Sequence, residues 1–325
     1  MSIKVSICVA FFNRSECVLE TIQSLLNQNY DQFEVVVVND GSTDPETALV
    51  LDNFNDIRLK VIHQKNTGFV GAIRNAIGHA TGDYIAIMGA GDVCDASRIK
   101  KQAAVLDAEK SVGIVSCLFE NVFYGGDKDG QRRQRNYPEK EIIASDFMKG
   151  SNPLGHGEVM FRKTVYEQVG GYRSFFKFSQ DLDLWLRMVE HCDVRIIREF
   201  LYERRIFIKD GVSTDPKKQN LQKYLAEFAR QCFNDRQHLG YDYVERYGVH
   251  AGLFRKPSVE LSNYSSIKAL HALKDDDYEG AMYFINLASN DVLTVKFILV
   301  KTLVVLSNFV IGRQLVNILL KLKST

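Results

Sequence analysis

The sequence predicts an α/β fold with a mainly parallel sheet and helices on both of its faces, followed by a helical C-terminal region. Apolar runs alternate with helical patterns over residues 3–120, an order typical of strand–helix–strand units in parallel sheets. Towards the end of the chain the patterns are helical only. We therefore expect a first domain over residues 1–215 and a helical region over residues 216–325.

The expected elements follow from local patterns in chain order. Residues 5–10 are a short apolar run, and residues 15–27 repeat leucine and isoleucine at helical spacing, which predicts a strand and then a helix. The next apolar run ends in Asn39-Asp40-Gly41-Ser42, and Asp44 or Thr43 can cap the helix that follows. Other strands are expected at 33–38, 58–63, 84–88, 113–124 and 194–197, a return strand or loop at 131–135, and helices at 70–80, 181–191, 266–273 and 278–288.

Bulk composition excludes several classes of protein. The net charge of +1 gives no overall field that would attract nucleic acid, and a hydrophobic content of 46% is enough for a sizeable core. Six cysteines are scattered without a Cys-x-x-Cys pair, which favours a reducing cytoplasm over a disulfide framework or a zinc site. The first residues enter a strand without the apolar core of a secretory signal. We therefore expect a cytoplasmic protein with no nucleic-acid partner.

The segment 292–325 is apolar and basic. It contains no Asp or Glu, and its charged residues are Lys296, Lys301, Arg313, Lys321 and Lys323. A membrane-spanning helix over 292–312 would place Lys301 near mid-bilayer, at a cost of roughly 2.5–3.5 kcal/mol. Two interpretations remain open: one or two helices lying on an anionic membrane surface, or a helix packed on the protein.

The apolar run at 84–88 ends abruptly in Gly89-Ala90-Gly91-Asp92. In an open α/β sheet, ligands bind just beyond the carboxyl ends of the strands. Small residues there let a ligand approach the backbone, and a carboxylate can hold a hard divalent cation against a diphosphate. Asp92 is therefore a candidate ligand of Mg²⁺ or Mn²⁺. The alternative is a strand-end turn without a ligand, for which Asp is also suited.

A series of short motifs runs along the first two-thirds of the chain. In order they are Ala10-Phe11-Phe12-Asn13-Arg14, Glu34-Val35-Val36-Val37-Val38-Asn39-Asp40-Gly41-Ser42-Thr43-Asp44, Asn66-Thr67-Gly68, Ala72-Ile73-Arg74-Asn75, Gly82-Asp83-Tyr84, Gly89-Ala90-Gly91-Asp92 and Gln180-Asp181-Leu182-Asp183-Leu184-Trp185-Leu186-Arg187. Each motif is weak alone, but their order and spacing together resemble the family-2 glycosyltransferases. The resemblance implies the GT-A fold and an inverting sugar transfer of the kind found in bacterial polysaccharide biosynthesis.

The resemblance also implies roles on the donor side. Asp40 would bind the nucleobase, with a helix-capping Asp as the alternative. Arg74 suits a diphosphate or a base edge, with an exposed helix arginine as the alternative. The family usually carries an Asp-x-Asp triplet whose carboxylates fall here on glycines, so Asp92 is the carboxylate that remains. The other donor-binding residues that we expect are Ala10, Phe12, Asn13, Gly89, Ala90 and Gly91.

Asp181 is the expected general base. Inversion requires a carboxylate that removes the acceptor hydroxyl proton as that oxygen attacks the anomeric carbon. The family usually has Glu-Asp where this chain has Gln180-Asp181. A helix N-cap is the alternative role for Asp181, and Asp183 is the fallback base. The acceptor side is expected to include Gln180, His156 (or a surface-loop histidine) and Trp185, for which a core position is the competing interpretation.

These expectations describe a cytoplasmic glycosyltransferase attached peripherally to an anionic membrane surface. Its donor would be a nucleotide diphosphate sugar, and its acceptor a saccharide or lipid-linked saccharide. The phosphate of a lipid-linked acceptor could be contacted by Arg132, Arg133 and Arg135; the alternative is that these arginines form a solvated face. The main alternative is a catalytically degenerate binding or scaffold protein, because three positions that are usually acidic are neutral here. A nucleotidyltransferase is disfavoured because the loop at 11–15 is not rich in glycine.

Overall fold

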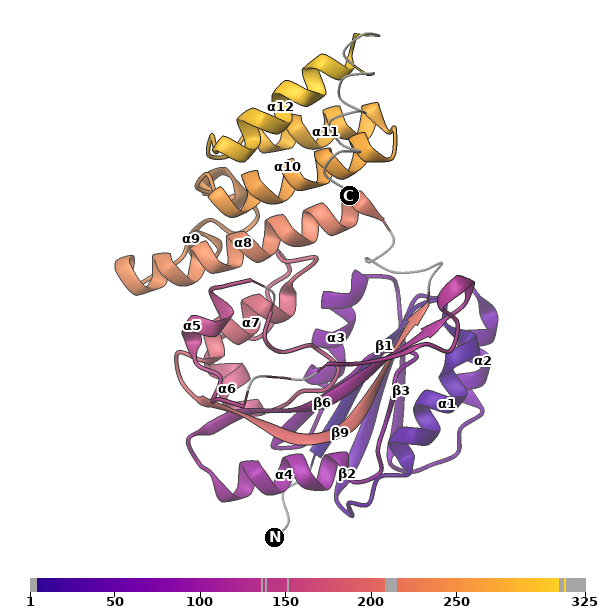
Figure 1. Cartoon of the computed structure of the whole chain (residues 1–325). Helices are drawn as coiled ribbons and strands as arrows, with labels where there is room; N and C mark the ends of the chain where they lie inside the picture. The colour runs from indigo at the N-terminus through magenta and orange to yellow at the C-terminus, as the bar shows by residue number, and fades with distance from the viewer. Residues whose placement is uncertain are drawn as a thin grey trace. The chain divides into compact units, whose positions relative to one another are not determined.

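The computed structural model describes residues 5–135, 137, 139–150, 152–207, 215–309 and 313. The chain forms two compact units, Met1–Asp215 and Pro216–Thr325, and each has its own hydrophobic core (Figure 1).

The strands of the first unit form one sheet. Within the described residues its order is β3-β2-β1-β4-β8-β6-β9-β5, and β7 pairs with β6 outside this path. The bounds are β1 (Val5–Phe11), β2 (Phe33–Asp40), β3 (Leu59–Gln64), β4 (Tyr84–Met88), β5 (Val93–Cys94), β6 (Val112–Tyr124), β7 (Arg132–Arg135), β8 (Met160–Arg162) and β9 (Asp193–Phe207). The sheet is parallel from β3 to β4 and mixed beyond β4, because β8 runs antiparallel to both β4 and β6.

Helices cover both faces of this sheet, which confirms the expected fold class. They are α1 (Ser15–Leu26), α2 (Pro45–Asp52), α3 (Gly68–Gly78), α4 (Arg98–Ala108), α5 (Ala144–Phe147), α6 (Lys163–Gln168) and α7 (Gln180–Met188). Alternate residues of a strand point to opposite faces. Ile7 and Val9 therefore share the main core with residues of α1 and α4, whereas α3 packs on β1 and β2 with its buried Ile73 outside that core.

The strand β9 is much longer than the sequence predicts. The expected strand covers residues 194–197, but β9 continues through a run of charged residues to Phe207. Its continuation pairs in parallel register with β6, from Phe119 opposite Tyr202 to Tyr124 opposite Phe207. Backbone hydrogen bonds to β6 hold these polar residues in the sheet, and such pairing is invisible to a hydrophobic pattern. The helix α4 also lies outside the expected elements.

The second unit is helical within its described residues. Its helices are α8 (Pro216–Leu239), α9 (Tyr243–Tyr247), α10 (Val259–Lys274), α11 (Tyr278–Ala288) and α12 (Val295–Ser307). The expected helical hairpin is present as α10 and α11. The side chain of Asp277 caps α11 by accepting a hydrogen bond from the backbone N–H of Gly280, as an Asp at this position usually does.

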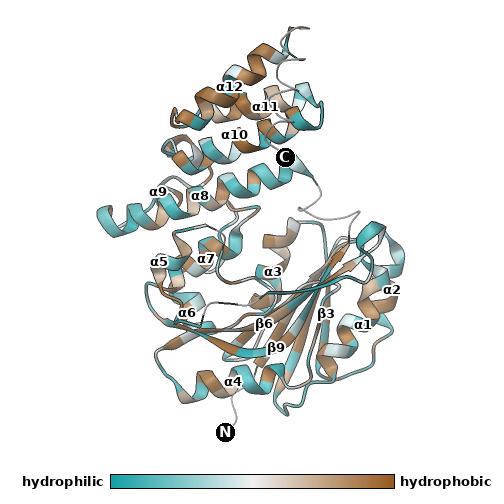
Figure 2. Cartoon of the chain, viewed as in Figure 1, coloured by the Kyte–Doolittle hydropathy of each residue, from teal (hydrophilic) through white to brown (hydrophobic). Residues whose placement is uncertain are grey.

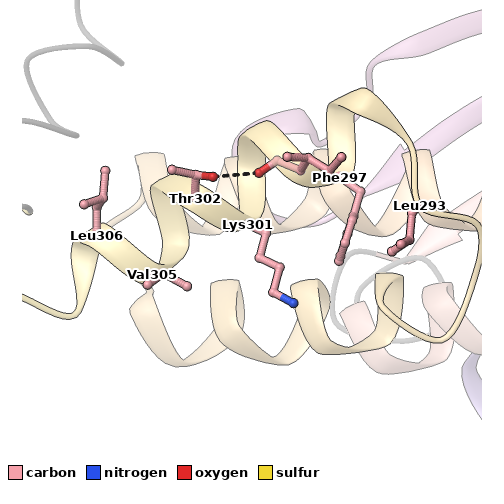
Figure 3. A pocket seen from close by; sticks show the side chains of 7 residues that line it. Leu293, Phe297, Lys301, Thr302, Val305 and Leu306 are labelled. Carbon is pink, nitrogen blue, oxygen red and sulfur yellow. Dashed lines mark hydrogen bonds between the residues drawn. The ribbon is translucent and has the colours of Figure 1, made fainter.

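Among the described residues, only one side of α12 is covered. Phe297, Val300 and Val304 are buried against α10 and α11, whereas Ile298 and Leu299 are exposed. Figure 2 shows how strongly apolar this helix is. A shallow groove runs along it, lined by Leu293, Phe297, Ile298, Lys301, Thr302, Val305 and Leu306 (Figure 3).

The expected membrane-binding tail is therefore only partly visible. Residues 310–312 and 314–325 lie outside the described residues. No helix in the described part of the chain has both the length and the apolar character needed to cross a bilayer.

Candidate functional site

The ends of β1 and β2 carry the first group of expected donor-binding residues. Ala10 is half-buried, and Phe12 is 45% exposed directly after β1. Asn13 has a positive φ of 50°. Its side-chain oxygen accepts hydrogen bonds from the backbone N–H groups of Thr43 (2.8 Å) and Asp44 (3.2 Å). Asn13 thereby ties the loop after β1 to the loop after β2.

Asp40 ends β2 and is almost fully buried. Its Oδ1 accepts hydrogen bonds from Gln64 Nε2 (2.7 Å) and from the backbone N–H of Thr67 (2.8 Å). The side chain that caps α2 is that of Asp44, which accepts from the backbone N–H of Glu46. The capping alternative for Asp40 is therefore wrong, and Asp40 instead holds the turn in front of α3.

The first turn of α3 leads towards the expected acceptor side. Arg74 is exposed on this helix, as both of its interpretations require. The ring of Phe69 meets the ring of His156 edge-on, with 5.3 Å between the centroids. The structure therefore brings α3 close to the loop that carries His156.

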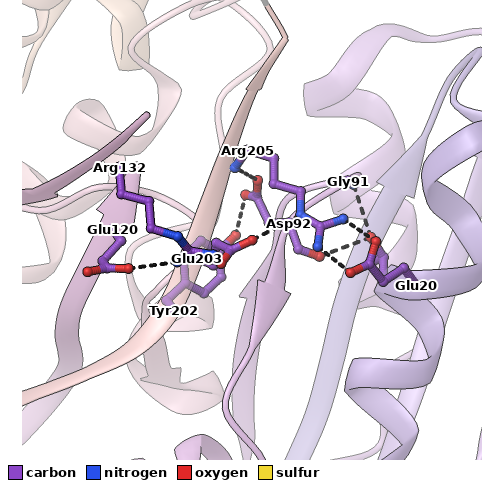
Figure 4. A network of polar contacts seen from close by, with 9 residues as sticks. Glu20, Gly91, Asp92, Glu120, Arg132, Tyr202, Glu203 and Arg205 are labelled. Carbon is purple, nitrogen blue, oxygen red and sulfur yellow. Dashed lines mark hydrogen bonds and ion pairs between the residues drawn. The ribbon is translucent and has the colours of Figure 1, made fainter. Parts of the chain in front are cut away.

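Asp92 is held by hydrogen bonds from β9 at the end of β4 (Figure 4). Its Oδ2 accepts from the Tyr202 hydroxyl (2.5 Å) and its Oδ1 accepts from the backbone N–H of Arg205 (2.8 Å). The same hydroxyl accepts from the backbone N–H of Gly89 (3.0 Å). Burial raises the pKa of Asp92, and the bond from Tyr202 only partly opposes this effect.

The glycines beside Asp92 are required by its position. A Cβ atom on Gly89 would lie 2.2 Å from Asp92 Oδ2. Gly91 has a φ of +99°, which side chains with a Cβ rarely adopt. Ala90 lies between them and is half-buried. The space that a side chain would take at Gly89 is therefore filled by Asp92, and Gly91 is buried close to Phe207.

These residues do not fit a resident divalent cation. Mg²⁺ and Mn²⁺ prefer several oxygen ligands that are free to coordinate. Here a single buried carboxylate remains, and both of its oxygens already accept hydrogen bonds. Among the described residues, no group of three or more His, Cys, Asp or Glu is placed to hold a metal. The surroundings of Asp92 thus argue against the metal-binding role expected for it.

The loop at 152–158 is folded around a buried glutamate. Glu158 Oε1 accepts hydrogen bonds from the Tyr137 hydroxyl (2.8 Å) and the backbone N–H of Gly155 (2.6 Å). Arg135 donates to the backbone oxygen of Asn152 (2.7 Å). These contacts fix the loop, although sequence analysis did not identify Glu158; its only signal was an acidic residue within an otherwise apolar run.

His156 lies on this loop among aromatic rings. Its Nε2 is 2.6 Å from the Tyr172 hydroxyl, and its ring packs on Phe69, Tyr172 and Trp185. Burial lowers the pKa of His156 to about 4, so the imidazole is neutral at pH 7. His156 is thus a half-buried loop residue held by its aromatic neighbours, and its place on the acceptor side stays a prediction.

Asp181 stands in the first turn of α7, next to the half-buried Gln180. Asn152 Nδ2 donates a hydrogen bond to Asp181 Oδ2 over 3.0 Å. Ser179, which precedes the helix, has a φ of 54° and makes no side-chain cap. Burial raises the pKa of Asp181 above its usual value, and hydrogen bonds from the backbone and Asn152 only partly offset this. The loop of His156 and the N-terminus of α7 thus meet at this carboxylate.

The other two candidates on α7 are structural. Asp183 is 1% exposed and forms ion pairs with Arg173 and Arg187, so it is not a free base. Trp185 is fully buried, and its Nε1 donates to the backbone oxygen of Gly155 (3.3 Å). The core interpretation of Trp185 is correct, and the residue supports the loop of His156 from beneath.

The strand β9 contributes residues that sequence analysis missed. Tyr202 and Arg204 alternate along it and therefore point to the same face of the sheet. Tyr202 bonds Asp92, whereas Arg204 is exposed. The only available signal was the alternation of large residues beyond 197, and it was hidden by the surrounding charges.

Comparison with known proteins adds the family. A family model described as glycosyl transferase family 2 matches residues 6–170, slightly more than half of the chain. EpsE of Bacillus subtilis, assigned as a glycosyltransferase, is 33% identical over 193 residues, which make up 58% of this chain and 67% of that protein. The uncharacterized glycosyltransferase MJ1057 of Methanocaldococcus jannaschii is 29% identical over 229 residues, or 68% of this chain and 77% of that protein.

Solved structures share the fold. TarS 1-349 of S. aureus in complex with UDP-GlcNAc has a TM-score of 0.58 and 17% identity, and the likeness covers 88% of this chain and 81% of that chain. Its complex with UDP has a TM-score of 0.54, also at 17% identity, over 94% of this chain and 91% of that chain. This likeness shows a fold of the GT-A type, as expected.

Proposed function

The chain belongs to glycosyl transferase family 2, and on this premise we propose that it moves a sugar from a nucleotide diphosphate sugar to a saccharide hydroxyl with inversion. The TarS chains with the same fold were solved with UDP-GlcNAc and UDP, which supports a nucleotide sugar as the donor here. Asp40 ends β2 and Asn13 follows β1, at the strand ends where a ligand binds in this class of sheet; Arg74 is the expected diphosphate-binding residue on α3.

The observation that carries this proposal is the placement of Asp181. Asp181 is a half-buried residue at the start of α7 whose carboxylate accepts a hydrogen bond from Asn152, a residue of the loop that also carries His156. The raised pKa makes it a stronger base than an ordinary Asp. In the proposed step Asp181 takes the proton of the acceptor hydroxyl, whose oxygen forms the new bond to the anomeric carbon. The bond from that carbon to the diphosphate oxygen breaks, and its electron pair leaves with the diphosphate.

The family generally uses a divalent metal, but the reaction proposed here contains no step through one. The expected Mg²⁺ or Mn²⁺ lacks a fitting set of ligands around Asp92. The proposed reaction therefore requires another source of positive charge beside the departing diphosphate.

We place the acceptor on the side of His156 and Gln180, and propose a saccharide, free or lipid-linked, of a cell-surface polysaccharide. The uncovered side of α12 supports attachment to an anionic membrane, since it joins exposed apolar residues to Lys296 and Lys301 without an acidic residue. All six cysteines are free thiols, which supports a cytoplasmic location.

One observation favours a second candidate. Gly89 and Gly91 replace the carboxylates that usually hold the cation, which is also expected of a degenerate protein that binds a nucleotide sugar without turnover. The two candidates differ in whether Asp181 acts as a catalytic base.

The test is a panel of nucleotide sugars incubated with the protein and with saccharide acceptors, with release of nucleoside diphosphate as the readout. We expect one donor to be consumed, and Asp181→Asn to lower that rate by about 10²–10⁴-fold. Asp31→Asn is the matched control, because Asp31 is exposed and far from α7 in sequence. Binding without turnover of any donor would support the degenerate protein, and an unchanged rate in Asp181→Asn would remove Asp181 as the base.

A further inference from the structure

We propose that Arg204 binds the diphosphate of the donor and supplies the positive charge that a metal ion would otherwise provide. This inference rests on the proposed function and names the group that neutralises the leaving diphosphate. Arginine suits this task because its planar, permanently charged guanidinium donates several hydrogen bonds to phosphate oxygens at once.

The strand end at Gly89-Ala90-Gly91-Asp92 does not offer the ligands that a metal needs. Asp92 is committed to Tyr202 and to the backbone of Arg205, and there is no space for a carboxylate at Gly89. An anion approaching here needs a cation that reaches it from another element.

Arg204 lies on β9 close to Tyr202. Tyr202 reaches Asp92 and passes so close to Gly157 that a Cβ there would lie 1.9 Å from the Tyr202 hydroxyl. Arg204 is two residues further along the strand and extends from the same face. Its side chain is therefore next to Tyr202 on the side of the sheet that carries Asp92 and the loop of Gly157.

No contact within the described residues requires the charge of Arg204. It is exposed, and within the described residues it makes no hydrogen bond or ion pair. Arg133 lies in the same row of the sheet, with Asn121 between them, because β6 pairs Asn121 with both residues. Two positive charges therefore lie on one face, about 10 Å apart by strand spacing.

The neighbouring arginines differ in this respect. Arg132 and Arg205 point to the opposite face, where Arg132 pairs with Glu120 and Glu203 and Arg205 pairs with Glu20 and Glu203 (Figure 4). Their charges are neutralised within the protein. Among the described residues, Arg204 thus differs from these two neighbours in forming no ion pair.

The charge of Arg204 is felt by the groups around the proposed reaction. Besides the larger effect of burial, it lowers the pKa values of Asp92, His156 and Asp181. One guanidinium that acts on all three groups lies among the end of β4, the loop of His156 and the start of α7. This is where the diphosphate of a donor must lie if Asp181 is to serve the acceptor.

In the transfer step Arg204 acts on the leaving group. As the bond between the anomeric carbon and the diphosphate oxygen breaks, that oxygen gains the electron pair and negative charge. The guanidinium donates hydrogen bonds to the diphosphate and stabilises this charge. The acceptor oxygen forms the new bond to carbon and gives its proton to Asp181, so that the step balances without a further reactant.

The test is binding of UDP, GDP, dTDP, CDP and ADP to the full chain by calorimetry, in EDTA and in Mn²⁺. We expect at least one to bind in EDTA, and Arg204→Gln to weaken that binding at least tenfold. Arg204→Lys, which keeps the charge, should recover part of the affinity. Arg246→Gln is the matched control, since it removes an exposed arginine from α9 in the second unit, and it should change the affinity less than twofold.

Each other result has a definite meaning. Binding that requires Mn²⁺ would overturn the role of Arg204 and leave the proposed function in place, as would equal affinities of the wild type and Arg204→Gln in EDTA. Binding of none of the five, with or without Mn²⁺, would contradict the proposed function itself.

Discussion

The Tyr202 hydroxyl donates a hydrogen bond to the Asp92 carboxylate over 2.5 Å, although the two residues are 110 positions apart in the sequence. The same hydroxyl accepts a hydrogen bond from the backbone N–H of Gly89. One buried phenol thus joins β9 to the end of β4 and determines what the strand end can bind.

Removal of this hydroxyl should destabilise the protein. In Tyr202→Phe, Asp92 Oδ2 and the Gly89 N–H lose a buried partner, and we expect a loss of about 1–3 kcal/mol in the free energy of unfolding. Urea denaturation measures it. Tyr283→Phe is the control, because Tyr283 is 40% exposed; equal stabilities of the two variants would contradict the bond.

Glycine 89 should resist substitution for a steric reason. In Gly89→Ala the new Cβ would meet Asp92 Oδ2, and we expect a loss of about 1–3 kcal/mol in stability. Gly78→Ala should instead be neutral or gain up to about 1 kcal/mol, because a Cβ on this helical glycine meets nothing within 4 Å. Thermal unfolding of the two variants measures the difference, and similar changes in Tm would show that Asp92 does not occupy this space.

The pH dependence of transfer should report Asp181. The base works when ionised, so activity should fall as the pH is lowered through its raised pKa. Asn152→Ala removes a bond that favours the charged carboxylate, which raises this pKa and moves the acid limb of kcat to higher pH. Asn53→Ala, at the end of α2, is the control. A lower rate with an unmoved limb would give Asn152 a structural role only.

The buried ion pairs of Asp183 should contribute to stability at neutral pH. Asp183→Asn leaves Arg173 and Arg187 without their carboxylate, at a cost of about 3–5 kcal/mol. Although burial opposes it, the two arginines lower the pKa of Asp183. The stabilisation is therefore complete above the unfolded pKa of about 3.9 and is lost as the pH falls through the lower folded value.

Unfolding curves of the wild type and Asp183→Asn should accordingly converge in acid. Asp193→Asn, an exposed aspartate on β9, is the comparison and should remain close to the wild type at every pH. A difference in the free energy of unfolding between the wild type and Asp183→Asn that stays constant into acid would exclude the ion pairs as its source.

Binding to anionic vesicles should depend on the uncovered side of α12. Leu299→Glu places a negative charge among its exposed apolar residues and should reduce flotation with phosphatidylglycerol vesicles about tenfold or more, from lost burial and repulsion. Leu49→Glu is closely matched, since Leu49 and Leu299 are 61% and 62% exposed, and it should have no effect. Equal flotation of the two variants would remove the membrane surface from the proposal.

Much of the first unit could be predicted because its signals are local. The runs that form β1 and β4 are apolar from end to end, and Asp44 caps α2 within three residues of its own position. The position of Asp181 in the first turn of α7 also follows from its own segment. In each case the contacts that determine the structure lie between near neighbours in the chain.

The candidate site was predicted in part for the same reason. Asp92 was identified because it follows an apolar run. Its environment was not predicted, because Tyr202 and Arg205 come from a strand whose charged residues show no hydrophobic pattern. His156 was identified from its residue type, and Asn152 was missed. Their contacts could not be predicted, because the Phe69 ring beside His156 and the Asp181 carboxylate beside Asn152 belong to other elements.

The sequence alone determined the α/β class, the places where strands end and the positions of the carboxylates along the chain, because these depend on local periodicity and on residue type. The tertiary structure decided which of those carboxylates are free. Long-range pairing of β6 with β9 brings a tyrosine to Asp92, ion pairs neutralise Asp183, and Asp181 retains access to solvent. One of the two partners of Asp183 is local, since Arg187 lies one turn further along α7. Asp92 and Asp181 are separated by contacts between residues of different segments, which no pattern within one segment encodes.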